Sequence, residues 1–200
     1  MALGRISPLR LVLWSLVALA LAGVAWTAVV QPRLQTDVLS QLGRGDYQLV
    51  TTEGEPFTED SLRGAPTAVF FGFTHCPEVC PTTLGEIGTW QDTLAEAGQD
   101  PLRVFFVTVD PRRDTEQVLG EYVSWVPDVV GVTGQPEQVD KALRAFRVYA
   151  SRIPLENGDY TMDHSASVLL FDRRGRFFEP IGYQEDHDRV VDKIGRLIAG

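Results

Sequence analysis

The stretch "PTAVFFGFTHCPEVCPTTL", residues 66–84, predicts a strand, a loop that contains both cysteines of the chain, and a helix. The run Pro66–Thr74 is almost continuously apolar, which is typical of a strand buried on both faces. After the loop, apolar residues recur every three or four positions as far as Gly98, so this part predicts an amphipathic helix. Pro81 favours the first turn of that helix, which leaves Cys76 and Cys80 in the loop that enters it.

Strands and helices alternate along the rest of the chain, which predicts an α/β fold built on a mixed sheet with helices on both faces. The segment from Tyr149 to Tyr160 contains the turn signal "ENGDY" and is expected to be irregular. In sheets of this kind, chemistry collects beyond the carboxyl ends of the strands, where Cys76 is placed. The other expected elements are hairpins over 47–64 and 167–182, strands over 102–110 and 128–134, and helices over 114–126, 135–148 and 186–200.

The N-terminal run Leu11–Val30 has 20 residues and no charge, so a helix over it is long enough to cross a bilayer. Two arginines precede the run closely and one follows it, which predicts a cytoplasmic N-terminus. We expect a membrane anchor over 1–30, a linker over 31–45 and a domain over 46–200. The expected location is a bacterial inner membrane, with the domain in the oxidising periplasm. A cleaved signal peptide is the alternative, although its apolar region is usually shorter.

The composition is that of an ordinary globular chain, with 44% apolar and 22% charged residues. The formal net charge is −9, and the chain contains no basic cluster. Proteins that bind DNA or RNA place lysine and arginine against the phosphates, so nucleic acid is not an expected partner.

The two cysteines lie four residues apart and allow three interpretations: a permanent disulfide, a redox switch, or part of a metal site. On a helix this spacing places the two Cα atoms about 6 Å apart, within reach of a disulfide or of one shared metal ion. A helix N-terminus also favours thiolates, which act both as nucleophiles and as ligands for soft metals. A permanent disulfide is the least favoured interpretation, because closing so short a loop stabilises little.

The three histidines differ in what surrounds them. His187 lies among charged residues, and the side chain of His75 is expected to point away from its neighbour Cys76. His164, in "DYTMDHSASVLLFD", precedes a strand and can reach the cysteine loop if that strand is central. A structural zinc site needs four ligands and would therefore require two of the histidines. Two thiolates and one imidazole suit copper, with Met162 as a further soft candidate that is more simply explained by packing.

Three segments together resemble the Sco/SenC copper proteins: "FFGFTHCPEVCPTTL", "VTVDPRRDT" and "DYTMDHSASVLLFD", in this order after one membrane span. The resemblance covers about residues 46–200 and implies a thioredoxin-like fold. By position, Cys76, Cys80 and His164 match the family's copper ligands, and the resemblance implies that the two cysteines also form a reversible disulfide. One departure is Glu116, where relatives often have proline after "DPRRDT"; it affects helix initiation and no ligand.

The resemblance implies delivery of copper, as Cu(I) or Cu(II), to the CuA centre of cytochrome c oxidase, which is metal handling more than enzyme catalysis. The alternative is a thiol-disulfide oxidoreductase that keeps the cysteines of that centre reduced. A peroxidase is less favoured, because Pro-Glu follows Cys76 in place of the flanking residues that such chemistry uses. The CxxxC spacing argues against an ordinary CxxC reductase. Expected partners are the oxidase subunit that carries CuA and, as further candidates, another periplasmic copper chaperone or a thiol reductase.

Overall fold

The computed structural model describes residues 8–31, 39–156 and 158–200, and the chain divides into two compact units, Met1–Ser40 and Gln41–Gly200. Part of the expected linker, residues 32–38, lies outside the described residues. The first unit contains helix α1, Pro8–Ala25, which continues into a π-helical turn, η1, Trp26–Val30.

Within these elements, Leu9–Ala28 is long and apolar enough to span a membrane, and none of it is buried against other parts of the chain. This stretch overlaps the expected span Leu11–Val30. A signal sequence meets the same criteria of length and composition.

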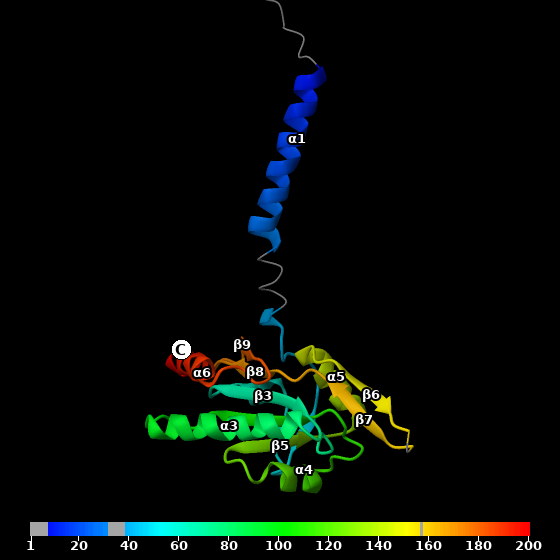
Figure 1. Ribbon diagram of the computed structural model, residues 1–200, viewed down its shortest axis with the longest axis vertical. Helices are drawn as coiled ribbons and strands as arrows, with labels where there is room; N and C mark the ends of the chain where they lie inside the picture. The colour runs from blue at the N-terminus through cyan, green and yellow to red at the C-terminus, as the bar shows by residue number, and fades with distance from the viewer. Residues whose placement is uncertain (1–7, 32–38, 157) are drawn as a thin grey trace, which may run out of the picture. The chain divides into compact units, whose positions relative to one another are not determined.

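The second unit is built on a seven-stranded mixed sheet with the strand order β2-β1-β5-β4-β3-β8-β9 (Figure 1). The three central strands β5, β4 and β3 are parallel, and antiparallel strands flank them on both sides. Every residue of β3 and nearly every residue of β4 is buried, as their continuous apolar runs predict. The strands are β1 Leu49–Thr51, β2 Pro56–Phe57, β3 Thr67–Gly72, β4 Arg103–Thr108, β5 Val129–Thr133, β8 Val168–Phe171 and β9 Phe177–Ile181.

Helices cover both faces of the sheet. Successive side chains of β3 point to opposite faces, and two neighbouring residues of this strand show which helix lies on each face. The ring of Phe71 contacts Phe146 of α5 at 5.1 Å between centroids. Gly72, the next residue, faces Cys80 of α3, and α6 packs beside α3. The mixed α/β fold with flanking helices is therefore confirmed. The helices are α3 Val79–Glu96, α4 Glu116–Val123, α5 Pro136–Phe146, α6 His187–Ala199 and the short 3-10 helix η2 Glu59–Leu62.

Helix boundaries follow local chemistry with one difference from expectation. Helix α3 begins at Val79, two residues before Pro81, so Cys80 lies inside its first turn. The helix ends before Gly98, whose φ of +66° suits glycine. The hydroxyl of Thr115 caps α4 by accepting a hydrogen bond from the Val118 amide.

The expectation of an irregular segment over Tyr149–Tyr160 is wrong. Strands β6, Ala150–Pro154, and β7, Tyr160–His164, form an antiparallel hairpin that is a separate two-stranded sheet. The hairpin extends away from the main sheet (Figure 1). Its residues are mostly exposed or half-buried. Apolar and polar residues alternate in the short β7 but not in β6, so the sequence does not mark the pair as a hairpin.

The compact unit begins five residues before the expected boundary at Asp46. Leu42 is 6% exposed, and the carbonyl of Gly43 accepts a hydrogen bond from the buried Tyr47 hydroxyl. Gly43 has a φ of +79°, and a Cβ there would lie 2.8 Å from the side chain of Leu62. Residues 41–45 therefore pack as part of the domain.

Candidate metal centre

Both thiols lie where the central strand β3 passes into helix α3. The side chain of Cys80 is fully buried, whereas Cys76 is half-buried, and both are free cysteines. The backbone amide of Cys80 donates a hydrogen bond to the Cys76 sulfur over 3.3 Å. Gly72 leaves room for this arrangement, because a Cβ there would lie 2.8 Å from the Cys80 sulfur and 2.6 Å from the Phe106 ring.

The third member of the cluster, His164, comes from the end of β7. Its Nε2 lies 3.7 Å from the Cys80 sulfur, and its Nδ1 lies 2.9 Å from the backbone carbonyl of Ser165. Because a carbonyl can only accept, Nδ1 carries a proton, and Nε2 is the ring nitrogen that faces the thiols. The ring also packs edge-on against Phe73 at 5.7 Å.

Ligand atoms of Cys76, Cys80 and His164 all lie within 4.8 Å of one another. The set of two soft sulfurs and one imidazole nitrogen fits copper. This cluster is therefore one that can bind copper, and it combines residues 84 positions apart in the sequence.

A buried carboxylate holds the cysteine loop in place. Asp114 accepts hydrogen bonds from the hydroxyls of Thr74 and Thr108, each over 2.6 Å, and from the Thr74 amide over 3.2 Å. Burial raises the pKa of Asp114, while the two threonines lower it. Thr74 lies two residues before Cys76, so this carboxylate fixes the backbone that enters the cysteine loop.

A second set of contacts from the same segment holds the hairpin. The guanidinium of Arg113 pairs with Asp110, donates to the Tyr160 carbonyl over 3.0 Å, and stacks 3.8 Å from the Tyr160 ring centre. The Tyr160 hydroxyl donates to Asp110 over 2.9 Å, and Arg152 of β6 stacks on the same ring at 3.9 Å.

Sequence reasoning missed these supporting roles, although the motif "VTVDPRRDT" contains Asp110, Arg113 and Asp114. Its charged residues follow a fully buried strand, and that position was the available signal. Three residues of one loop, Asp110, Arg113 and Asp114, therefore connect it to both the cysteine loop and the histidine hairpin.

The pKa values of the two thiols are shifted in opposite directions. Hydrogen bonds from Cys80 and then from His164 lower the pKa of Cys76 to about 4, although burial opposes the shift. The hydrogen bond to Cys76 and burial raise the pKa of Cys80. Cys76 is therefore the thiolate at neutral pH, while Cys80 keeps its proton beneath it.

The other candidate residues lie elsewhere. His75 is exposed, and its Nδ1 lies 3.0 Å from the Thr74 hydroxyl. His187 is an exposed residue at the start of α6, with its Nε2 3.3 Å from the Thr93 hydroxyl. Met162 is half-buried and packs against the core. Among the described residues, neither of these two histidines belongs to the Cys/Cys/His cluster.

Comparison with known proteins places the chain in a family. The family model described as SCO1/SenC matches residues 36–199. Among curated proteins, the mitochondrial protein SCO1 of Saccharomyces cerevisiae is 39% identical over 75% of this chain and 52% of its own length. The mitochondrial SCO2 homologue of Homo sapiens is 33% identical over 95% of this chain and 75% of its own. The chain spans about half the length of the yeast relatives that it matches.

Two solved structures with copper bound share the domain. ScoI of Bradyrhizobium japonicum is 39% identical, with a TM-score of 0.70 over 78% of this chain and 99% of that one. Yeast Sco1 is 37% identical, with a TM-score of 0.73 over 80% of this chain and 90% of that one. Together with the Cys/Cys/His cluster, these matches establish that the chain belongs to the SCO1/SenC family and has its thioredoxin-like fold.

Proposed function

We propose that this protein is a membrane-anchored assembly factor that binds copper and delivers it to the CuA centre of cytochrome c oxidase. The observation that carries the proposal is the convergence of Cys76, Cys80 and His164, which we propose as the copper ligands. Copper is here the cargo, and two thiolates with one imidazole suit the Cu(I) ion without further ligands. The copper-bound structures of two relatives support this assignment.

The protein's own residues prepare the cluster for cargo. Cys76 is ionised at neutral pH, and the Ser165 carbonyl holds His164 with its Nε2 toward the thiols. Cys80 loses its proton only when a cation takes its place. Because Cys76 is half-buried and Cys80 is buried, an incoming ligand from an acceptor can replace Cys76 first.

We propose a bacterial inner-membrane location, with the N-terminus in the cytoplasm and the domain in the periplasm. The apolar stretch Leu9–Ala28 and the arginine bias around it support this orientation. Residues 1–30 then form the anchor, and a linker leads to the domain, whose compact part begins at Gln41. The oxidase subunit with CuA is the proposed partner, and no nucleic-acid partner is proposed.

A thiol-disulfide oxidoreductase is the second candidate, because the pKa of Cys76 is lowered to about 4 beside a free, protonated Cys80. In that reaction the Cys76 thiolate attacks a partner disulfide and releases one partner thiol. Cys80 then loses its proton and displaces the second thiol, which leaves the Cys76–Cys80 disulfide and a reduced partner.

His164→Ala separates the two functions, since it removes the ligand that takes no part in sulfur exchange. We expect this variant to bind copper weakly, to cycle its disulfide normally, and to fail in restoring oxidase activity to a deletion strain at limiting copper. Cys76→Ser should fail under all conditions. Restoration by His164→Ala equal to wild type at low copper would contradict copper delivery and favour the reductase.

A further inference from the structure

Helix α4 exposes an apolar stripe next to the metal cluster. Val118 is 39% exposed and Trp125, just beyond the helix end, is 56% exposed, with the half-buried Tyr122 between them in the sequence. Spacings of four and three residues keep these side chains on one side of the helix. The Trp125 indole lies over α3, 3.9 Å from the Cβ position of Gly85. An exposed tryptophan beside a partly exposed tyrosine is typical of protein interfaces.

The stripe reaches the thiols through one layer of aromatic packing. The Tyr122 ring contacts Phe106 at 5.7 Å, and the Phe106 ring and the Cys80 sulfur meet at the same Cβ position of Gly72. The Tyr122 hydroxyl is buried and has no hydrogen-bond partner among the described residues. Burial raises the pKa of Tyr122. A molecule seated on the stripe therefore lies beside the cluster.

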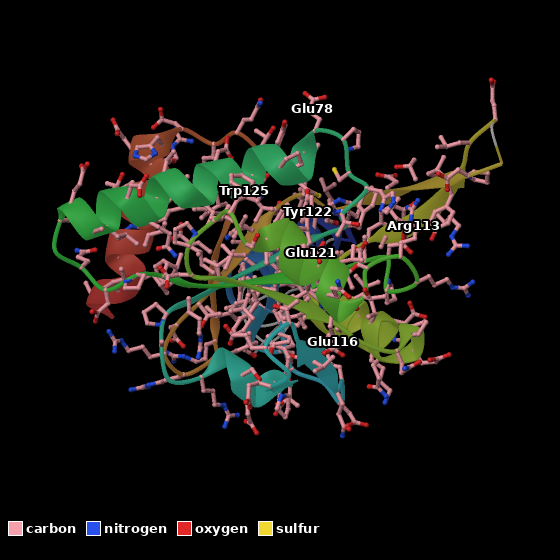
Figure 2. All side chains as sticks on the ribbon, turned by 90° about the horizontal axis from the view of Figure 1, so that it is seen from below. Glu78, Arg113, Glu116, Glu121, Tyr122 and Trp125 are labelled. Carbon is pink, nitrogen blue, oxygen red and sulfur yellow. The ribbon has the colours of Figure 1, made fainter. Side chains whose placement is uncertain are left out.

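Carboxylates border the stripe. Glu121 lies beside Tyr122 and Trp125 on the face shown in Figure 2, with Glu78 at the start of α3 and Glu116 at the start of α4. All three glutamates are exposed, and no ion pair to them occurs in the described part of the chain. Arg113, the labelled cation on this face, is paired with Asp110. Among the charged side chains labelled in Figure 2, those without an ion pair are therefore all negative.

We propose that this α4 face, made of Val118, Tyr122 and Trp125 with Glu78, Glu116 and Glu121 around them, is where the copper acceptor docks. The inference rests on the proposed function and adds the chemistry of the partner: an apolar contact surrounded by lysine or arginine. Uncompensated carboxylates attract a basic surface and repel an acidic one, which sets the association rate and the partner choice. Docking here places the acceptor one layer of aromatic rings away from the Cys80 sulfur.

The test uses the full chain in nanodiscs, loaded with Cu(I), and the reduced, metal-free soluble CuA domain of cytochrome c oxidase. Copper transfer is followed by rapid mixing. We expect Trp125→Ala and Glu121→Lys each to slow transfer about tenfold or more, and rising salt to slow the wild type. Glu137→Lys is the matched control, because it makes the same charge change on α5, across the sheet, where Glu137 is exposed. Copper affinity, measured against a chromogenic chelator, should be unchanged in all variants.

A photo-reactive benzophenone amino acid in place of Trp125 or of Glu137 provides a measurement that does not depend on transfer. We expect cross-links to the CuA domain from position 125 and none from 137. Transfer at the wild-type rate by both face variants, or cross-linking from 137 alone, would overturn the docking face and leave copper delivery intact. Cross-linking from 125 without any transfer would support the face and contradict delivery. If cross-linking and copper transfer are both absent, the docking face and copper delivery are both overturned.

Discussion

The cysteine half and the histidine half of the metal cluster are built in opposite ways. Cys80 is fully buried where β3, an entirely buried strand, passes into an 18-residue helix. His164 ends a hairpin whose two strands pair only with each other and contain no fully buried residue. The cysteine half is therefore as rigid as the core, and the histidine half depends on a few polar and stacking contacts. The geometry of the Cys/Cys/His cluster therefore depends on how firmly the hairpin holds His164 against the two cysteines.

The largest effect is expected from breaking the buried half directly. Cys80→Ser replaces a soft ligand by a hydroxyl, so the affinity for Cu(I) should fall by more than about 100-fold, beyond the loss typical of an outer-shell partner. Competition with a chromogenic Cu(I) chelator measures this loss. Retention of affinity within about tenfold of wild type would show that Cys80 is not a ligand.

Asp114→Ala should break the support of the cysteine half and lower the stability of the whole domain. The hydroxyls of Thr74 and Thr108 lose their acceptor in a buried site, which should reduce the free energy of unfolding by about 3 kcal/mol. Urea unfolding measures the change, with the exposed Asp92→Ala on α3 as the control. Equal stability of the two variants would contradict a structural role for this carboxylate.

Arg113→Gln should release the hairpin while leaving the core folded. The variant loses the stacking on Tyr160 and the hydrogen bond to its carbonyl. We expect copper affinity to fall about tenfold, the range for a residue that orients a ligand, and amide exchange to rise in β6 and β7 alone. Tyr160→Phe keeps the ring and loses only the hydroxyl bond to Asp110, so its effect should be smaller. Faster exchange throughout the sheet would contradict a local role.

The smallest effect is expected for the interaction of His164 with the Cys76 thiolate, measured as a change in the pH dependence of alkylation. Cys76 has a pKa lowered from 9.0 to about 4, partly by His164. Its thiolate therefore stabilises the fold fully above pH 9, and this contribution is lost as the pH falls through about 4. Alkylation of the metal-free protein by iodoacetamide should stay fast down to about pH 5 and then decline. His164→Ala should move that decline to higher pH; an unchanged profile would show that the histidine does not act on the thiol.

Sequence alone determined the buried half. Continuous apolar runs identify β3 and β4 because a strand covered on both faces needs apolar residues throughout. The period of α3 and the position of the cysteines at its start follow from residues that are neighbours in the chain. The resemblance carried by three motifs then supplied the fold and the three candidate ligands, and the family is confirmed.

Only the tertiary structure decided the histidine half. Strand β7 alternates apolar and polar residues over only four positions and β6 does not alternate, so the sequence did not show that the two strands pair. The roles of Asp110, Arg113 and Tyr160 arise from contacts across about 50 residues, and the start of the domain at Gln41 arises from packing around Gly43. Local patterns record what a residue does with its chain neighbours. The placement of His164 against the thiols depends on partners that the chain brings together only when it folds.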